Sequence, residues 1–427
     1  MRVRLALLGY GWVADRHMQA AHALGVDRVE VVGVAGHHGD RAAAFARRHG
    51  IAVATDDWQA LVASSGVDAV VIGTPNALHH PQTLAALGEG KHVLVEKPMA
   101  VSVAQAEEVV ARAAATGLVL AVGHMWRYRD EVIALRQRID RGDLGRIVRT
   151  HGYGVHEGWG PSGWFTDAAL SGGGALIDMG IHAIDTARFL LGDPQPVRVQ
   201  ASIGVGEFHD EEVDDDGLVL VDWEGGARSL IEFGWWEPHL GGLEAETEVR
   251  GTAGFAQIWP DALPAPEGYE HCSVPMYAAQ LADFVTCCAS GATPAASAEV
   301  GLTALRVVEA AYGAAGQPRR SCRSLQRSTA PHERYHTHQA QPVLRQERVH
   351  RPLRHQMRAQ RGGVEELTVR TRRTLHPPIL FDPRPERESS RSPQIAQQSP
   401  RLSSGCTSAR SLRCSGRRSP GGWERAS

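Results

Sequence analysis

Between residues 3 and 122 the sequence alternates short apolar runs with amphipathic segments, and this alternation constrains the fold more than any other feature. We expect strands in the apolar runs at 3–8, 29–34, 69–72, 92–95 and 119–122. We expect helices between them at 13–24, 41–49, 58–63, 81–87 and 103–115. Strands that are apolar on both faces and separated by helices predict an α/β fold, with a doubly wound parallel sheet covered on each side.

After about residue 125 the pattern changes to strands in succession. The expected helices are 130–141, 175–191, 276–289 and 300–315, and the expected strands are 147–155, 197–205, 217–223, 227–236 and 247–258. Few helices separate these strands, which predicts a second α/β domain with an open, mostly antiparallel sheet and helices on one face. We therefore predict a first domain at 1–125 and a second at 126–318.

The remaining segment, 319–427, has a different composition. It holds 23 arginines, no lysine and 8 acidic residues, a balance of +15, whereas residues 1–318 carry a balance of -18. Three interpretations are open: a disordered basic arm for nucleic acid or acidic partners, a linker, or an out-of-frame translation of GC-rich DNA. We favour the last, because the change is abrupt and directly follows a well-patterned helix. We assign this tail no functional residues.

Charge and composition exclude several function classes for residues 1–318. A strongly acidic body repels phosphates, so we expect no nucleic-acid partner. No apolar run approaches the ~20 residues of a membrane span. The short apolar start leads directly into a glycine motif, which favours a first strand over a signal peptide. The six cysteines form no CxxC pair and no zinc spacing, so we expect no metal and a cytoplasmic location.

The glycine motif that follows the first strand reads Gly9-Tyr10-Gly11-Trp12-Val13-Ala14 and opens a helix. In a G-x-G-x-x-A motif the first glycine permits a tight turn and the second lets the backbone approach a pyrophosphate. The alanine allows close packing of helix and sheet, and the helix N-terminus favours negative charge. This context predicts a Rossmann domain that binds a dinucleotide, with cofactor contacts from Gly9, Gly11, Trp12 and Val13.

The end of the second strand bears on the choice between NAD and NADP. A carboxylate is expected there to bind the ribose diol, but the sequence has Gly36, His37 and His38. We interpret Asp40 as the cap of the next helix. Gly36, His37 and Arg41 are therefore candidate cofactor residues. The basic side chains of His37, His38 and Arg41 suit a 2′-phosphate, which slightly favours NADP.

Three further motifs carry a family resemblance. They are GTPN at 73–76 followed by His79, GKHVLVEKP at 90–98, and GGGALIDMGIHAID at 172–185. Residues 1–318 resemble the glucose–fructose oxidoreductase, inositol dehydrogenase and rhizopine catabolism (Gfo/Idh/MocA) family. The resemblance implies a nicotinamide-dependent oxidoreductase.

Lys97, Asp178 and His182 are the candidate catalytic residues that the resemblance implies. Lysine occurs twice beside 43 arginines, at 91 and 97. Lys97 ends a strand, at the edge where doubly wound sheets bind ligands, and lysine can lower its pKa where arginine cannot. We interpret Lys91 as solvated. Asp178 and His182 are spaced i, i+4 on one helical face, so His182 can act as base while Asp178 binds the substrate hydroxyl or orients the imidazole.

The resemblance adds further candidates with alternative roles. For the cofactor they are Thr74, Pro75, Asn76, His79, Glu96, Lys97 and Arg127, and for the substrate Lys97, Trp164, Asp178 and His182. Asn76 also suits a helix cap, Glu96 a structural role and Arg127 a surface ion pair. Phe165 replaces a basic residue of many relatives, which leaves the polarity of the pocket open. Pro98 resembles a residue whose peptide bond is often cis.

Other polar and aromatic residues have competing interpretations. Asp185 is equally suited to stabilise its helix or to act in catalysis. We interpret the aspartates at 214–216 as a solvated turn, since they lack the spacing of a calcium loop. Aromatic residues of the second domain suit either a sugar-binding wall or packing; they are Tyr153, His156, Trp159, Trp235 and Trp236.

Together these features predict an NAD(P)-dependent dehydrogenase that exchanges a hydride with a secondary alcohol or ketone of a sugar, inositol or related polyol. One alternative is the same frame acting on an imine, a dihydrodiol or another carbonyl. Another is a nucleotide-binding regulator without catalysis. The resemblance also implies a homodimer or homotetramer through the open sheet face.

Overall fold

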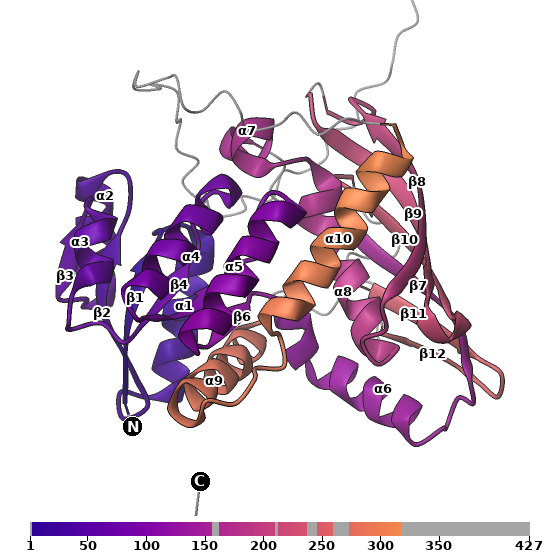
Figure 1. Ribbon diagram of the computed structural model, residues 1–427, viewed down its shortest axis with the longest axis horizontal. Coiled ribbons are helices and arrows are strands. Elements are labelled where there is room, and N and C mark those ends of the chain that lie inside the picture. The colour runs from indigo at the N-terminus through magenta and orange to yellow at the C-terminus, as the bar shows by residue number, and fades with distance from the viewer. Residues whose placement is uncertain (1, 156–161, 210–211, 237–245, 259–272, 317–427) are drawn as a thin grey trace, which may run out of the picture. The chain divides into compact units, whose positions relative to one another are not determined.

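The computed structural model describes residues 2–155, 162–209, 212–236, 246–258 and 273–316 (Figure 1). These residues belong to one compact unit of the chain. The tail predicted at 319–427 lies outside the described residues, as do His156 and Trp159.

The first sheet is parallel and confirms the predicted alternation. Its strands run in the order β3 (Val53–Thr55), β2 (Val29–Ala35), β1 (Val3–Leu8), β4 (Ala69–Ile72), β5 (His92–Val95) and β6 (Leu120–Val122). Every pair in this order is parallel. The order reverses between β1 and β4, and this switch point opens the crevice where such sheets bind ligands. β3 was not predicted, because its three residues, two of them exposed, give no buried apolar run.

Helices cover both faces of the first sheet. They are α1 (Trp12–Leu24), α2 (Gly39–His49), α3 (Trp58–Ala63), α4 (His79–Gly88) and α5 (Val103–Thr116). Along β1, Leu5 and Leu7 enter one apolar core and Ala6 and Leu8 the other, as strand alternation requires. α9 (Val274–Ser290), which follows the second sheet in the chain, adds its apolar side chains to the Leu5 face beside α1.

The second sheet is mostly antiparallel, as predicted. Its order is β12 (Phe255–Ile258), β11 (Glu246–Gly251), β7 (Ile147–Val155), β10 (Arg228–Gly234), β9 (Asp214–Trp223) and β8 (Pro196–Val205). Among these described strands, β7 and β10 form a parallel pair and the other four pairs are antiparallel. The single strand predicted at 247–258 is wrong: Gly251 donates to the Gly254 carbonyl at 2.9 Å and closes a hairpin turn.

One face of the second sheet is buried and the other is open. Ile231 and Phe233 of β10 point into a core shared with α8 (Ile181–Leu190) and α10 (Ala298–Ala314), which lie beside the sheet in Figure 1. The alternate residues Leu218 and Arg228 are exposed. α6 (Asp130–Asp140) packs against β12. Among the described residues, no helix has the length and apolarity needed to cross a bilayer.

The predicted helix at 175–191 begins with a π-turn. Residues Leu176–Gly180 (η4) form this wide turn, and α8 continues from it. The shorter elements of the site region are η1 (Asn76–Leu78), η2 (Met125–Tyr128), η3 (Gly163–Phe165) and α7 (Ala168–Ser171); η5 (Glu224–Gly226) joins β9 to β10. Since π-turns inside α-helices are frequent at functional sites, this segment is a candidate part of the site.

Candidate functional site

The phosphate loop lies between the carboxyl ends of three strands. Gly9 has φ +106°, and a Cβ there would collide with the carbonyl of Gly73, so the position requires glycine. Its N–H donates to the Ala35 carbonyl at 2.8 Å. Gly11 is the N-cap of α1, and a Cβ at this position would meet no described atom within 4 Å. The exposed helix N-terminus and the free space at Gly11 fit the pyrophosphate of a dinucleotide.

The end of β2 is shaped by Tyr10. The Tyr10 ring covers Gly36, where a Cβ would collide with it, and its hydroxyl accepts the His38 N–H at 3.3 Å. The His37 and His38 rings meet edge to face at 4.7 Å. His38 is the N-cap of α2, so the expectation that Asp40 caps this helix is wrong. Asp40 lies in the first turn, where its charge still complements the helix dipole.

The loop after β4 is fixed by hydrogen bonds to other segments. The Thr74 hydroxyl donates to Gln82 Oε1 at 2.7 Å. Asn76 Nδ2 donates to the Ser171 carbonyl at 2.8 Å, and the side chain caps neither η1 nor α4. Asn76 therefore ties this loop to α7.

His79 bridges two loops at the same edge. Its Nδ1 lies 2.7 Å from the Pro98 carbonyl oxygen, and its Nε2 lies 2.8 Å from the carbonyl oxygen of Thr74. Burial lowers the pKa of His79. The ring thus links the loop after β4 to the Lys97–Pro98 segment, whose peptide bond is cis.

Lys97 and Asp178 are in direct contact. Lys97 follows β5, and its Nζ donates to the backbone carbonyl and to Oδ1 of Asp178, both at 2.8 Å. Trp235 Nε1 donates to Asp178 Oδ2 at 3.1 Å. The Lys97 side chain keeps 16% of its surface exposed and that of Asp178 keeps 8%. His182 is buried in the first turn of α8, four residues beyond Asp178.

Glu96 and the aromatic candidates have contacts of their own. Glu96 Oε1 lies 2.8 Å from His17 Nε2 of α1, and both side chains are buried. The half-buried Trp164 ring stacks on Phe165 at a centroid distance of 3.9 Å. Trp12 is exposed beside Gly11, and the Arg16 guanidinium lies 4.8 Å from its ring centroid.

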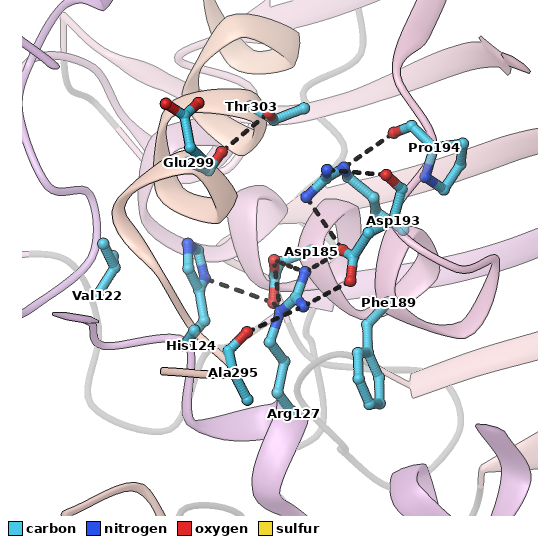
Figure 2. Close-up of polar contacts among 12 residues, drawn as sticks. Val122, His124, Arg127, Asp185, Phe189, Asp193, Pro194, Ala295, Glu299 and Thr303 are labelled. Atoms are coloured by element: carbon cyan, nitrogen blue, oxygen red, sulfur yellow. Dashed lines mark hydrogen bonds and ion pairs between the residues drawn. The ribbon is translucent and has the colours of Figure 1, made fainter. Parts of the chain in front are cut away.

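A buried ionic cluster joins η2 to α8 (Figure 2). Arg127 of η2 donates from Nε and Nη2 to Asp185 at 2.8 Å and from Nη2 to Asp193 at 2.6 Å. Burial alone would lower the pKa of Arg127, and the two carboxylates instead hold it above its ordinary value. His124 Nδ1 lies 3.7 Å from Asp185 Oδ2, and burial lowers the pKa of His124. Arg127 therefore forms a buried ion pair, where a surface one was the expected alternative.

Two further interpretations from the sequence are wrong. Lys91 is buried, and its Nζ donates to the carbonyls of Ser64 and Val67 at 2.9 Å each. Asp214 and Asp215 begin β9 and are buried acceptors, so they form no solvated turn. Among the described residues, no cluster of three or more His, Cys, Asp or Glu side chains is arranged to hold a metal ion.

Comparisons with known proteins agree with this geometry. Residues 3–124 match the oxidoreductase family with an NAD-binding Rossmann fold, and residues 132–257 match the GFO/IDH/MocA C-terminal domain. D-glucoside 3-dehydrogenase of Escherichia coli K12 is 34% identical over 245 residues, which is 56% of this chain and 68% of the relative. The scyllo-inositol 2-dehydrogenase (NADP(+)) IolU of Bacillus subtilis 168 is 29% identical over 273 residues, 63% of this chain and 79% of the relative.

Solved structures share the fold. The crystal structure of GenD2 from gentamicin A biosynthesis, in complex with NAD, superposes with a TM-score of 0.67 at 28% identity. The match covers 74% of this chain and 94% of that structure. Both domains of the sequence resemblance are therefore matched. The chain belongs to the Gfo/Idh/MocA family of NAD-binding oxidoreductases.

Proposed function

We propose that the chain is an NAD(P)-dependent dehydrogenase that exchanges a hydride with a secondary alcohol or ketone of a sugar, inositol or related polyol. The observation that carries this proposal is the contact of Lys97 Nζ with Asp178 at the carboxyl edge of the first sheet. It joins an ammonium and a carboxylate from different domains beside the ligand crevice. The named activities of the relatives, on a glucoside and on an inositol, support this substrate class.

The cofactor would lie across the strand ends, with its pyrophosphate at Gly11. The other proposed contacts come from Gly9, Trp12, Val13, Gly36, His37, Arg41, Thr74, Pro75, Asn76, His79, Glu96 and Lys97. We propose that Arg127 supports the cofactor site and does not contact the cofactor through its guanidinium, because that group already forms ion pairs with Asp185 and Asp193. When bound, the oxidised nicotinamide supplies the hydride acceptor.

The three candidate catalytic side chains, Lys97, Asp178 and His182, have different proposed roles in the proton transfer and in the stabilisation of charge. As the substrate C–H gives up its hydride, the hydroxyl proton passes to the His182 imidazole, which acts as general base. A lysine ammonium has three N–H donors, and Asp178 accepts two of those on Lys97. The third is proposed to donate to the developing alkoxide. Asp178 keeps the ammonium in place, and Trp164 is the proposed wall of the sugar site.

A full-length preparation tests the reaction by absorbance at the NAD(P)H band with a panel of inositols, aldoses and sugar acids. We expect turnover with at least one polyol. We expect Lys97→Ala to abolish turnover, whereas nucleotide binding, measured by fluorescence titration, persists through the other proposed contacts. Nucleotide binding without turnover on any polyol would refute the dehydrogenase and favour another substrate class or a regulator.

We propose a slight preference for NADP. The end of β2 lacks a carboxylate, and His37 and Arg41 supply positive or hydrogen-bonding groups near the expected 2′-phosphate. Arg41→Ala should weaken NADP+ binding more than NAD+ binding. Arg47→Ala, at the far end of α2, is the matched control and should affect neither. Tighter binding of NAD+ by the unmodified protein would overturn the preference.

We propose a homodimer or homotetramer through the open face of the second sheet. Leu218 of β9 is 45% exposed on this face. Leu218→Lys should therefore lower the oligomer mass in analytical ultracentrifugation. A monomeric unmodified protein would contradict the proposal.

A further inference from the structure

The carboxylate of Asp214 contacts the segment that carries the candidate catalytic residues. Its Oδ1 accepts the Gly174 N–H at 2.8 Å and the Tyr312 hydroxyl at 2.7 Å. Its Oδ2 accepts the Leu176 N–H at 2.8 Å. The Asp214 residue is only 3% exposed, and each of these three partners is a donor, so the ionised carboxylate fits the site.

These contacts lie where the π-turn begins. Leu176 is the first residue of η4, and the first N–H groups of a helix have no partner within the helix. Asp214 supplies an acceptor for the Leu176 N–H and a second one for the Gly174 N–H just before the turn. A carboxylate also complements the positive end of the helix dipole. Asp178 follows Leu176 by two residues, and His182 lies one turn further on.

The glycines before the π-turn match this arrangement. A Cβ at Gly174 would collide with the backbone oxygen of Asp214, and a Cβ at Gly173 would collide with the Tyr312 hydroxyl. The glycines thus allow β9 and α10 to approach the turn closely. The approach is set by backbone and side-chain contacts from two elements that are distant in sequence.

We propose that Asp214, supported by Tyr312, is a positioning residue that holds the π-turn and thereby sets the places of Asp178 and His182. The inference rests on the proposed dehydrogenase for its kinetic consequence and on the contacts above for its structural one. Burial raises the pKa of Asp214, whereas the donors from Leu176, Tyr312 and Gly174 oppose that rise. Those donors therefore stabilise the charged form that the turn requires.

Asp215, the next residue of β9, offers a matched control. Its carboxylate is fully buried and also accepts three backbone N–H groups, from Glu207, Phe208 and His209, at 3.2, 2.7 and 2.8 Å. Those donors follow β8 and are not part of the π-turn, which His209 reaches, among the described residues, only through Trp235. Asp214→Asn and Asp215→Asn therefore remove the same charge from two similar burial sites.

The kinetic experiment compares these variants with the unmodified full chain at a temperature where each is folded. We expect Asp214→Asn to lower kcat by roughly 10- to 100-fold, since a ~1 Å misplacement of reacting groups costs about 10² in rate. The Kd for NAD(P)+ should not change. Asp215→Asn should lower the melting temperature and reduce kcat less than Asp214→Asn does, because in the described part of the chain His209 reaches Asp178 only through Trp235. An equal kcat loss in both variants, or none in Asp214→Asn, would overturn the proposal.

Hydrogen exchange separates this proposal from the dehydrogenase itself. Asp214→Asn should speed amide exchange in peptides covering 174–182, and Asp215→Asn should do so at 207–209. This readout decides the positioning role even when no polyol is turned over. If Asp214→Asn does not fold, Tyr312→Phe removes one of the three donors and should produce the same local exchange in smaller degree. Unchanged exchange at 174–182 in the folded variant would refute the role.

Discussion

Arg127 provides the sharpest test of the buried cluster that joins η2 to α8. Arg127→Met keeps most of the apolar stem and removes the guanidinium. The change leaves Asp185, whose side chain is 1% exposed, next to the carboxylate of Asp193. Two basic groups remain nearby: His124, with Nδ1 at 3.7 Å from Asp185 Oδ2, and Arg188, with Nη1 at 3.0 Å from Asp193 Oδ1. The variant therefore has a buried charge without its main partner.

The expected loss follows from burial. Removing one partner of a buried ion pair costs about 3–5 kcal/mol of unfolding free energy. The control is Arg306→Met, which breaks a pair with Glu107 between α10 and α5; these side chains are 43% and 52% exposed. An exposed pair contributes about 0–1 kcal/mol, so this variant should stay close to the unmodified protein.

Urea unfolding, followed by tryptophan fluorescence and circular dichroism, measures both losses. Arg127→Met combined with Asp185→Leu should recover most of the stability, because the unpaired charge is then gone. Burial alone would raise the pKa of Asp185, and Arg127 foremost holds it below its ordinary value. In Arg127→Met the pKa of Asp185 should therefore rise. Acidification then protonates Asp185, and the difference in unfolding free energy between the variant and the unmodified protein becomes smaller. A loss no larger than that of Arg306→Met would refute this reasoning.

Three further variants test the other contacts. His79→Ala should lose about 1–3 kcal/mol of unfolding free energy in urea, because a buried carbonyl loses its N–H donor. His80→Ala removes an imidazole that is 17% exposed and pairs with the exposed Glu108, so its loss should be smaller; equal losses would contradict the bridge. Gly11→Ala should weaken NAD(P)+ binding in a fluorescence titration at unchanged stability, because its Cβ meets no described atom within 4 Å but occupies the space proposed for the pyrophosphate. Gly9→Ala should instead lower the stability, because its Cβ collides with the Gly73 carbonyl. Unaltered binding in Gly11→Ala would exclude the pyrophosphate site. Since burial lowers the pKa of His124, stability should fall as pH drops below about 6.5, and His124→Phe should flatten that slope in a pH series of urea unfolding; an unchanged slope would count against it.

The sequence predicts the fold well where one pattern dominates. The strands at 69–72 and 92–95 are found with the predicted bounds, because fully buried parallel strands are continuously apolar. β3 and the hairpin at 251–254 were missed for a different reason. β3 has only three residues and no buried apolar run, and among the described strands it pairs only with β2. The hairpin pairs β11 with β12, which are neighbours in the sequence, and the run across 251–254 was read as one strand because its turn residues give a weak local signal.

The site was less accessible to sequence reasoning. The scarcity of lysine in the chain was used as evidence of a specific role for Lys97 only. Lys91 has a specific role too, because its Nζ donates to two backbone carbonyls. Asp214 was misread because adjacent carboxylates are typical of solvated turns, and its donors come from positions 38 and 98 residues away. The ion pair of Arg127 with Asp185 spans 58 residues and has no local signature.

The position of α9 has a consequence for synthesis on the ribosome. The apolar face of the first sheet that receives Leu281 and Phe284 is complete only when the chain beyond residue 290 has emerged. During translation, the nucleotide-binding half is therefore incomplete until a helix encoded after the whole second sheet has been made. Until then its first sheet exposes an apolar surface, which chaperones bind and which favours aggregation. The two halves therefore complete their folding together. A premature stop codon between them yields a first domain whose core lacks α9, and we expect that domain not to fold as an independent cofactor-binding module.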